Sequence, residues 1–323
     1  MADSTQATVV IGKWAASANR CRNQRSVDWD KAACSHDRSA LTVGALRATS
    51  GILSISPQLP WASSNVGLVW VFLLSGWVKN PHNDLPSVSV NAITLRPAAA
   101  RGHADHGWLD SRHSFSFADY QDPAHMGFRT LRVLNDDRVA PGRGFGAHPH
   151  RDMEIFSYVL EGAIEHKDSL GNGRVLTPGR IQLMSAGRGV THSEFNPSDS
   201  APLHFLQIWI LPRTRGLAPR YTEWEPSPEH VFARKVLVIS PDGREGSAII
   251  NQDADVYRVR LQPGESVTHT LPSGHGIWLQ IADGALEFNG VALQSGDGAS
   301  TETAGLLTLT ATAACEALLF DLA

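Results

Sequence analysis

The chain has 323 residues, of which 42% are hydrophobic and 19% charged, with 28 glycines and 18 prolines. This length allows about two domains, and the composition is that of a globular protein rich in turns. The formal net charge of −4 argues against a strong electrostatic attraction to nucleic acid or an anionic membrane. Three cysteines, an odd and sparse count, exclude a disulfide framework and predict a reducing, cytoplasmic location.

Residues 1–87 differ from the rest of the chain, and we expect them to form a poorly ordered extension. They hold five of the nine tryptophans and no glutamate, and their apolar residues show no sustained period of 2 or 3.6. The apolar run at 66–78 is shorter than the roughly 20 residues that span a bilayer, so we expect no membrane anchor. The C-x12-C-x-H spacing of Cys21, Cys34 and His36 does not by itself close a tetrahedral zinc site. We hypothesise that the native chain starts further downstream, which N-terminal sequencing or an intact mass would test.

From residue 88 onwards the sequence has the pattern of short strands separated by turns. The first strand is expected near 88–95, and turn signals then recur about every 8–12 residues without a long helical period. The strand at 127–134 is expected to end at the turn cluster Asn135-Asp136-Asp137. This pattern predicts an all-β sandwich or barrel. The following strands are expected at 154–160, 163–168, 181–184 and 203–211.

A second group of strands follows a segment rich in Pro, Arg and Glu. The segment 158–179 resembles 279–296 in its apolar residues and glycine turns, which indicates an internal repeat and hence a duplicated barrel. The second group is expected at 235–240, 254–261, 276–281, 306–311 and 317–322. The predicted organisation is therefore an extension at 1–87, a first domain at 88–215, a linker at 216–234 and a second domain at 235–323.

Two pairs of potential metal ligands lie within 142–196, each at spacing i, i+2. His148 and His150 form the first pair, and His192 and Glu194 form the second. Residues at i and i+2 of a β-strand share one face, so two such strands in a small barrel could surround one point with imidazoles and a carboxylate. Divalent transition metals take these ligands. The sequence therefore predicts a metal site in the first domain.

Other histidines are weaker candidates. His103, His106 and His113 form a dense group that could be a second ligand set, but we expect packing or hydrogen-bonding roles for them. His166 and His204 are interpreted as ordinary hydrogen-bonded histidines.

The second domain is expected to lack the site. When the repeat is aligned on its glycine turns, the positions of the first histidine pair fall on Thr270 and Pro272. His269 and His275 lie nearby but at the wrong phase. We therefore expect one metal ion per chain.

The residues around the first ligand pair resemble a known family. Gly142-x5-His148-x-His150, followed by an apolar strand that ends at Gly162, resembles the first motif of the cupin superfamily. The resemblance to the pirin family is closer still and covers about residues 92–323. It implies two tandem cupin (jelly-roll) β-barrels. The strings that are similar to pirins lie at 101–111, 148–171 and 184–194.

The pirin resemblance implies Fe²⁺ in the N-terminal barrel, bound by three histidines and one glutamate that map to His148, His150, His192 and Glu194. In the general cupin pattern a glutamate follows the second histidine by five residues, where this chain has Ile155. The nearest acid, Glu154, is one residue out of phase and would face the other side of its strand. Glu194 is favoured over Glu154 as the fourth ligand because it shares a face with His192.

The resemblance also implies an activity of the quercetin 2,3-dioxygenase type. A flavonol 3-hydroxyl would lose its proton and bind the metal, and O₂ would cleave the ring with loss of carbon monoxide. Four protein ligands leave two positions of an octahedral ion for a substrate oxygen and O₂. Glu194 would be both a ligand and the candidate general base. Side chains expected to hold the flat aromatic substrate are Phe128, Phe145, Met184 and Trp209.

An alternative that the same resemblance implies is a non-enzymatic regulator. Some pirin-like proteins are regarded as binding transcription factors or metabolic enzymes, with the iron as a redox switch. A protein partner therefore stays open as an alternative to a small aromatic substrate. We expect no direct nucleic-acid binding and no membrane association.

Overall fold

The computed structural model describes residues 93–323. The expectations for residues 1–87 lie outside the described residues, and so does most of the strand expected near 88–95. In the described part of the chain, no helix is long and apolar enough to cross a membrane.

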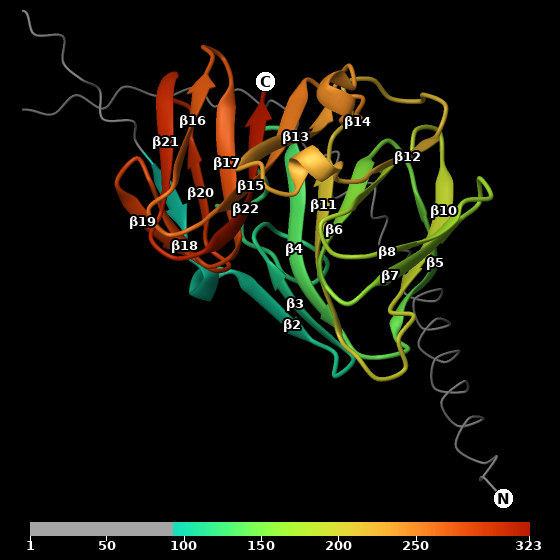
Figure 1. Cartoon of the computed structure of the whole chain (residues 1–323). Coiled ribbons are helices and arrows are strands. Elements are labelled where there is room, and N and C mark those ends of the chain that lie inside the picture. The colour runs from blue at the N-terminus through green and yellow to red at the C-terminus, as the bar shows by residue number, and fades with distance from the viewer. Residues whose placement is uncertain (1–92) are drawn as a thin grey trace, which may run out of the picture. The chain divides into compact units, whose positions relative to one another are not determined.

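The first domain consists of a seven-stranded and a four-stranded antiparallel sheet (Figure 1). The larger sheet has the order β12-β9-β6-β11-β4-β3-β2, and the smaller sheet has the order β5-β10-β7-β8. The larger sheet is formed by β2 (Gly102–Asp105), β3 (Leu109–His113), β4 (Leu131–Val139), β6 (Glu154–Glu161), β9 (Ile181–Ser185), β11 (Leu203–Ile210) and β12 (Arg220–Trp224). The smaller sheet is formed by β5 (Gly144–His150), β7 (Ile164–Asp168), β8 (Gly173–Leu176) and β10 (Val190–Phe195).

The second domain repeats this arrangement. Its larger sheet has the order β1-β20-β17-β22-β15-β13-β14, and its smaller sheet has the order β16-β21-β18-β19. The larger sheet is formed by β1 (Thr94–Arg96), β13 (Lys235–Ser240), β14 (Ala248–Ile249), β15 (Ala254–Leu261), β17 (Gly276–Asp283), β20 (Gly298–Thr301) and β22 (Cys315–Leu322). The smaller sheet is formed by β16 (Ser266–Leu271), β18 (Ala285–Phe288), β19 (Val291–Gln294) and β21 (Gly305–Ala311). Short 3-10 turns are η1 (Ala98–Ala100), η2 (Pro228–His230) and η3 (Arg244–Gly246).

The prediction of an all-β chain with two tandem barrels is confirmed. The two smaller sheets have matching strand orders, in which β16, β21, β18 and β19 stand where β5, β10, β7 and β8 stand in the first domain. The repeat seen in the sequence corresponds to β6–β7 and β17–β18, whose connecting turns contain Gly162 and Gly284. Both glycines have positive φ and lie so close to a neighbouring backbone carbonyl that a Cβ would clash with it.

Two edge strands lie outside the limits expected from the sequence. β1 falls within the expected first domain, yet it pairs with β20 of the second domain, with Thr94 opposite Ser300. β12 lies in the expected linker, 216–234, and pairs with β9. Trp224 at the end of β12 is buried, which holds this edge strand on the sheet. Short strands in polar, proline-rich sequence have too few alternating residues to show a period of 2.

β4 continues through Asn135, Asp136 and Asp137, which the sequence pattern indicated as a turn. Asn and Asp favour turns because their side chains bond the local backbone. Here neighbouring strands supply the partners instead. Asn135 lies opposite His113 and Gln207 in the ladder, and its Oδ1 is 2.8 Å from His113 Nδ1.

The two larger sheets pack against each other through one apolar cluster. Phe156 on β6 and Phe320 on β22 are fully buried, with ring centroids 6.3 Å apart. Side chains of this size contribute about 1.5–3 kcal/mol each when fully buried. Because the outer faces of the two sheets share this cluster, the barrels stabilise each other.

The interiors of the two barrels differ. The second barrel is filled by a single apolar cluster that includes Leu279, Phe288 and Leu309. The interior of the first barrel holds two separate apolar clusters, one around Phe205 and one around Trp209.

Candidate metal centre

A layer of polar side chains crosses the first barrel between its two apolar clusters. On β6, Ser157 lies between Ile155 of one cluster and Val159 of the other, and all three are buried. Alternate residues of a strand share a face, so neighbouring strands repeat this order. The corresponding series are Val133, Asn135, Asp137 and Val139 on β4, Trp209, Gln207 and Phe205 on β11, and Val190, His192 and Glu194 on β10.

The structure brings the three predicted histidine ligands together on the neighbouring strands β5 and β10. His148 stands opposite His192 in the ladder, and their ring centroids are 4.5 Å apart. The ring of His150 lies 4.8 Å from each of the other two rings. One nitrogen of each histidine lies within 4.8 Å of the others, so the three rings can converge on one ion.

Glu194 lies in the same layer but groups with His192 and His166 within 4.8 Å, rather than with all three predicted histidines. The register of β10 against β5 shifts between His192 and Glu194. Such an irregularity re-aims a side chain. Residues at i and i+2 share a face only where a strand alternates regularly, so the sequence pattern alone does not reveal this shift.

The imidazole nitrogens are in a state that suits metal binding. Nε2 of His150 and Nε2 of His192 are buried and have no hydrogen-bond partner in the described part of the chain. Burial lowers the pKa of both histidines to about 2, so both rings are neutral and keep a lone pair. His148 Nδ1 lies 2.7 Å from the carbonyl oxygen of Gly146, which assigns the proton to Nδ1 and leaves Nε2 free. Unpartnered buried polar atoms cost about 1–3 kcal/mol each, a cost that a bound divalent ion would remove.

The two candidate carboxylates face different parts of the molecule. Glu194 accepts hydrogen bonds from Ser157 Oγ at 2.8 Å and from Gln207 Nε2 at 2.6 Å, so both its oxygens are held inside the barrel. Glu154 accepts hydrogen bonds from Ser185 Oγ and from Asn251 of the second domain. The two acids point in the directions that the phase argument requires.

His166 is a part of the site that the sequence argument missed. It is fully buried, and its Nδ1 lies 3.4 Å from His192 Nδ1 and 2.6 Å from Gln182 Nε2. Its Nε2 lies 3.2 Å from Asp168 Oδ2. With the proton on Nε2 facing Asp168, Nδ1 accepts hydrogen bonds from Gln182 and from His192, which keeps Nε2 of His192 free. The signal in the sequence was the i, i+2 pair of His166 and Asp168 on a strand that pairs with β10.

A cavity of about 350 Å³ opens beside the ligands and is lined by both His148 and Glu194. Of the four side chains expected to hold a substrate, Phe145 and Trp209 line it. Phe128 instead packs against Trp278 of the second domain, with ring centroids 5.9 Å apart. The fourth, Met184, belongs to an apolar cluster and is fully buried.

The dense histidine group upstream also lines this cavity. His113 has the hydrogen-bonding role expected of it, through Asn135, and burial lowers its pKa. His103 Nε2 lies 3.3 Å from Asp110 Oδ1. His106 lines the cavity as well. In the part of the chain that the structure describes, these three do not form a ligand group.

Comparison with known proteins assigns the chain to a family. Residues 94–210 match the family model described as Pirin, and residues 237–322 match the model described as Quercetinase C-terminal cupin domain. The chain is 47% identical over 230 residues to a quercetin 2,3-dioxygenase of Escherichia coli K12. The matched region spans 71% of this chain and 98% of the relative. The chain belongs to the pirin family.

Other pirin relatives agree in sequence and in structure. A pirin-like protein of Caulobacter vibrioides is 42% identical to this chain, and the matched region spans 72% of this chain and 100% of the relative. The crystal structure of YhhW from E. coli matches with a TM-score of 0.69 and 46% identity, over 72% of this chain and 98% of that one. The bacterial pirin YhhW in complex with nickel(II) matches with a TM-score of 0.68 and 47% identity, over 72% and 99%.

The second cupin barrel places its histidines differently from the first. His269 Nε2 and His275 Nδ1 both bond the carboxylate of Asp321, at 2.8 and 2.7 Å. Thr270 and Pro272, which stand in the positions of the first histidine pair, are exposed. In the place of β10, strand β21 contributes apolar residues to the barrel core.

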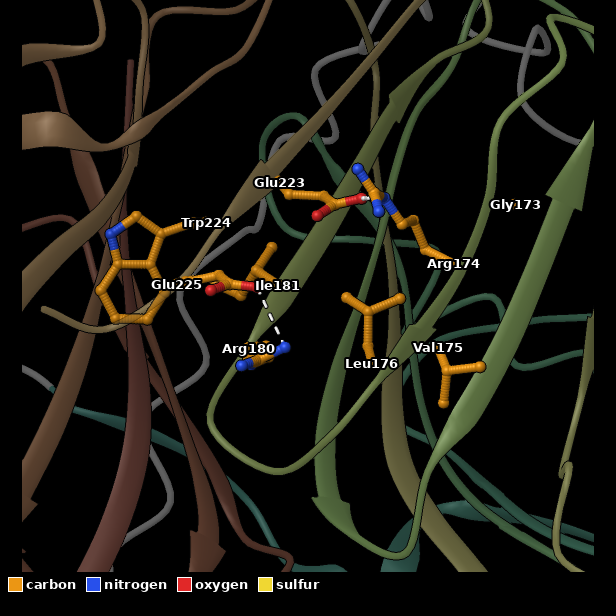
Figure 2. Close-up of a pocket in the computed structure, with 9 residues that line it drawn as sticks. All are labelled: Gly173, Arg174, Val175, Leu176, Arg180, Ile181, Glu223, Trp224 and Glu225. Carbon is orange, nitrogen blue, oxygen red and sulfur yellow. Dashed lines mark ion pairs between the residues drawn. The ribbon is translucent and has the colours of Figure 1, made fainter.

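A second hollow of the pirin domain, of about 320 Å³, lies between β8, β9 and β12 and is drawn in Figure 2. Its two arginines are paired with acids that also line it. Arg174 lies 3.2 Å from Glu223, and Arg180 lies 3.0 Å from Glu225. Each arginine of the hollow is therefore paired with an acid of the same hollow. The predicted metal ligands are not among its lining residues.

Proposed function

We propose that this member of the pirin family is a metal-dependent dioxygenase of the quercetin 2,3-dioxygenase type, with a flavonol or similar aromatic substrate. The observation that carries the proposal is the set of buried, unpartnered imidazole nitrogens beside an aromatic-lined cavity. The names of relatives, and the nickel(II) complex of a related pirin, support it.

The proposed ligands of one Fe²⁺ ion are His148, His150, His192 and Glu194. The residues fit such an ion because nitrogens of the three histidines lie within 4.8 Å of one another, and the carboxylate of Glu194 lies in the same polar layer within 4.8 Å of a nitrogen of His192. When bound, the ion would supply Lewis-acid and redox chemistry that the side chains lack. Ser157 and Gln207 hold the carboxylate, and His166 holds the ring of His192, so the ligands are oriented before an ion arrives.

The cavity is lined by aromatic residues and by polar residues of β3 and β4. Trp209 packs edge-on against His150, with ring centroids 4.9 Å apart, and together with Phe145 it gives an aromatic surface for a flat substrate. Polar residues of β3 and β4, including Ser111 and Asn135, line the cavity as well. The volume lies at the lower end of the about 300–1,000 Å³ typical of ligand sites, so bound substrate would exclude most water.

The experiment that tests the proposal is an anaerobic loading with Fe²⁺, followed by addition of quercetin and O₂. We expect loss of the flavonol absorbance and release of carbon monoxide. His148→Ala and Glu194→Gln should abolish turnover. His275→Ala, which removes an imidazole of the second domain, is the matched control and should retain it.

The outcomes separate the enzyme from its alternative. Turnover by His148→Ala or Glu194→Gln at the parent rate would refute the proposed site. Absence of turnover by the metal-loaded parent, with Fe²⁺ or with Ni²⁺, would refute the enzyme and favour the iron-containing regulator that binds a protein partner. A cytoplasmic location, expected from the cysteine count, stays a prediction.

A further inference from the structure

Asp137 is a buried carboxylate in the wall of the proposed substrate cavity. It lies on β4 within the polar layer and lines the cavity together with His148 and Glu194. Its Oδ1 accepts a hydrogen bond from Ser111 Oγ on the neighbouring strand β3. Its Oδ2 accepts no hydrogen bond from any described residue. One oxygen is therefore fixed, and the other is available to a molecule in the cavity.

The neighbouring carboxylates of Glu194 and Asp136 accept more hydrogen bonds from the protein than that of Asp137 does. Both oxygens of Glu194 accept hydrogen bonds from protein donors. Asp136, the next residue of the same strand, faces the other side, where Arg101 and His204 bond its carboxylate. No cation pairs with Asp137 in the described part of the chain.

The surroundings of Asp137 bring the pKa of its carboxyl group close to neutral pH. Burial raises its pKa to about 7, against the opposing effect of the hydrogen bond from Ser111. The negative charges of three nearby carboxylates, those of Asp136 on β4, Glu194 on β10 and Asp110 on β3, raise the pKa further. Its partner on β11 is the apolar Phe205. General bases are most effective when their pKa lies near the working pH.

We propose that Asp137 is the residue that accepts the proton of the substrate hydroxyl in this site. The O–H bond of the substrate breaks, the proton moves to Oδ2 of Asp137, and the electron pair stays on the substrate oxygen. The carboxylate becomes a neutral acid as the substrate becomes an anion, so the cavity gains no net charge. Glu194, assigned both roles from the sequence, would then serve as a metal ligand. This inference rests on the proposed function.

The test uses the proton as its readout, because ionisation alone does not show where the proton goes. The Fe²⁺-loaded protein is kept free of O₂ and mixed with 3-hydroxyflavone, which has a single hydroxyl group. Absorbance reports the ionisation of the bound flavonol, and a pH-indicator dye in weak buffer reports protons released to solvent. Working at about pH 8 keeps Asp137 ionised before the flavonol is added.

The bound flavonol anion raises the pKa of the neighbouring Asp137 above its value in the free site, which keeps the transferred proton on the carboxyl group. The wild-type protein should therefore bind the flavonol as its anion and release no proton. Asp137→Asn should either bind the neutral flavonol or release about one proton for each anion bound, because its amide cannot accept a proton. Asp199→Asn removes an exposed carboxylate that is not among the residues lining the cavity, and this control should behave as the wild type. Ser111→Ala keeps the acid but removes its donor, and should raise the pH at which proton uptake begins.

Three results would count against the inference or what it rests on. Asp137→Asn that binds the anion without releasing a proton would overturn the role of Asp137 and favour Glu194 as the acceptor. Ser111→Ala with the pH dependence of the wild type would likewise overturn it. A wild-type protein that binds no flavonol, or binds it without ionising it, would overturn the proposed function and this inference with it.

Discussion

Replacing Asp137 by Asn should stabilise the metal-free protein at neutral and alkaline pH. The unfolded chain carries this carboxyl group at its ordinary pKa of 3.8, whereas burial raises the pKa of the folded protein to about 7. Between these two values the folded state binds a proton that the unfolded state has lost. Stability therefore falls as pH rises through this window and stays low above it.

The size of the effect follows from the same two values. One pH unit corresponds to about 1.4 kcal/mol, so the window from 3.8 to about 7 amounts to at most about 4 kcal/mol. Asn resembles the protonated acid in shape and can accept the hydrogen bond of Ser111 through its own Oδ1. The variant should match the wild type near pH 4 and exceed it by up to about 4 kcal/mol at pH 8.

Urea unfolding of chelator-treated protein, followed at intervals from about pH 4 to pH 8, measures this difference. Asp119→Asn is the control, because its carboxylate is exposed and the same charge is lost there without a change in burial. Parallel pH profiles for Asp137→Asn and the wild type would refute the reasoning, since they would show that this carboxyl titrates alike in both states. Such a gain in stability, together with a loss of proton uptake, would mark Asp137 as kept for function.

Three further predictions concern the ligands, a turn and the domain interface. Gln207→Leu removes the donor at 2.6 Å from Glu194 and should weaken metal binding by about 10–100-fold in a chelator competition; unchanged affinity would exclude the orienting role. Gly162→Ala should lower the free energy of unfolding in urea by more than about 1 kcal/mol, because φ is +77° and the added Cβ would lie 2.4 Å from a carbonyl oxygen. Gly171→Ala is the control and should lower it less, because φ is +92° there but the space around the Cβ is open. Equal losses in the two variants would contradict the proposed clash. Phe320→Ala should lower the free energy of unfolding by about 3–5 kcal/mol, and it should lower the temperature of a single calorimetric transition in which both barrels unfold together. Two separate transitions in the wild type would show that the interface does not couple the barrels.

The grouping of the three predicted histidines could be predicted because the information is local. Each pair sits on one strand, and alternation along a strand is fixed by backbone geometry. The same reasoning separated Glu194, whose carboxylate is held inside the barrel by Ser157, from Glu154, whose carboxylate faces Asn251 of the second domain. The four-ligand assignment itself remains a prediction, and the shift in register between His192 and Glu194 shows where local reasoning ends.

The residues that support the ligands depend on register between strands, which a single sequence does not reveal. His166 meets His192 because β7 pairs with β10, and Ser111 meets Asp137 because β3 pairs with β4. Composition even gave the wrong indication at Asn135-Asp136-Asp137. Three turn-forming residues lie within a strand because the barrel supplies partners for their side chains.

The difference between the two barrels explains how the chain can hold such a site. Buried polar groups are costly unless fully bonded, and the first barrel has a whole layer of them, including nitrogens left without a partner. The second barrel has Leu307 and Leu309 on β21, the strand in the place of β10, and its core is a single apolar cluster. That core, and the apolar interface with Phe156 and Phe320, stabilise the pair without contributing a ligand. A duplicated barrel thus lets one copy supply stability while the other holds an unfavourable polar layer in place for chemistry.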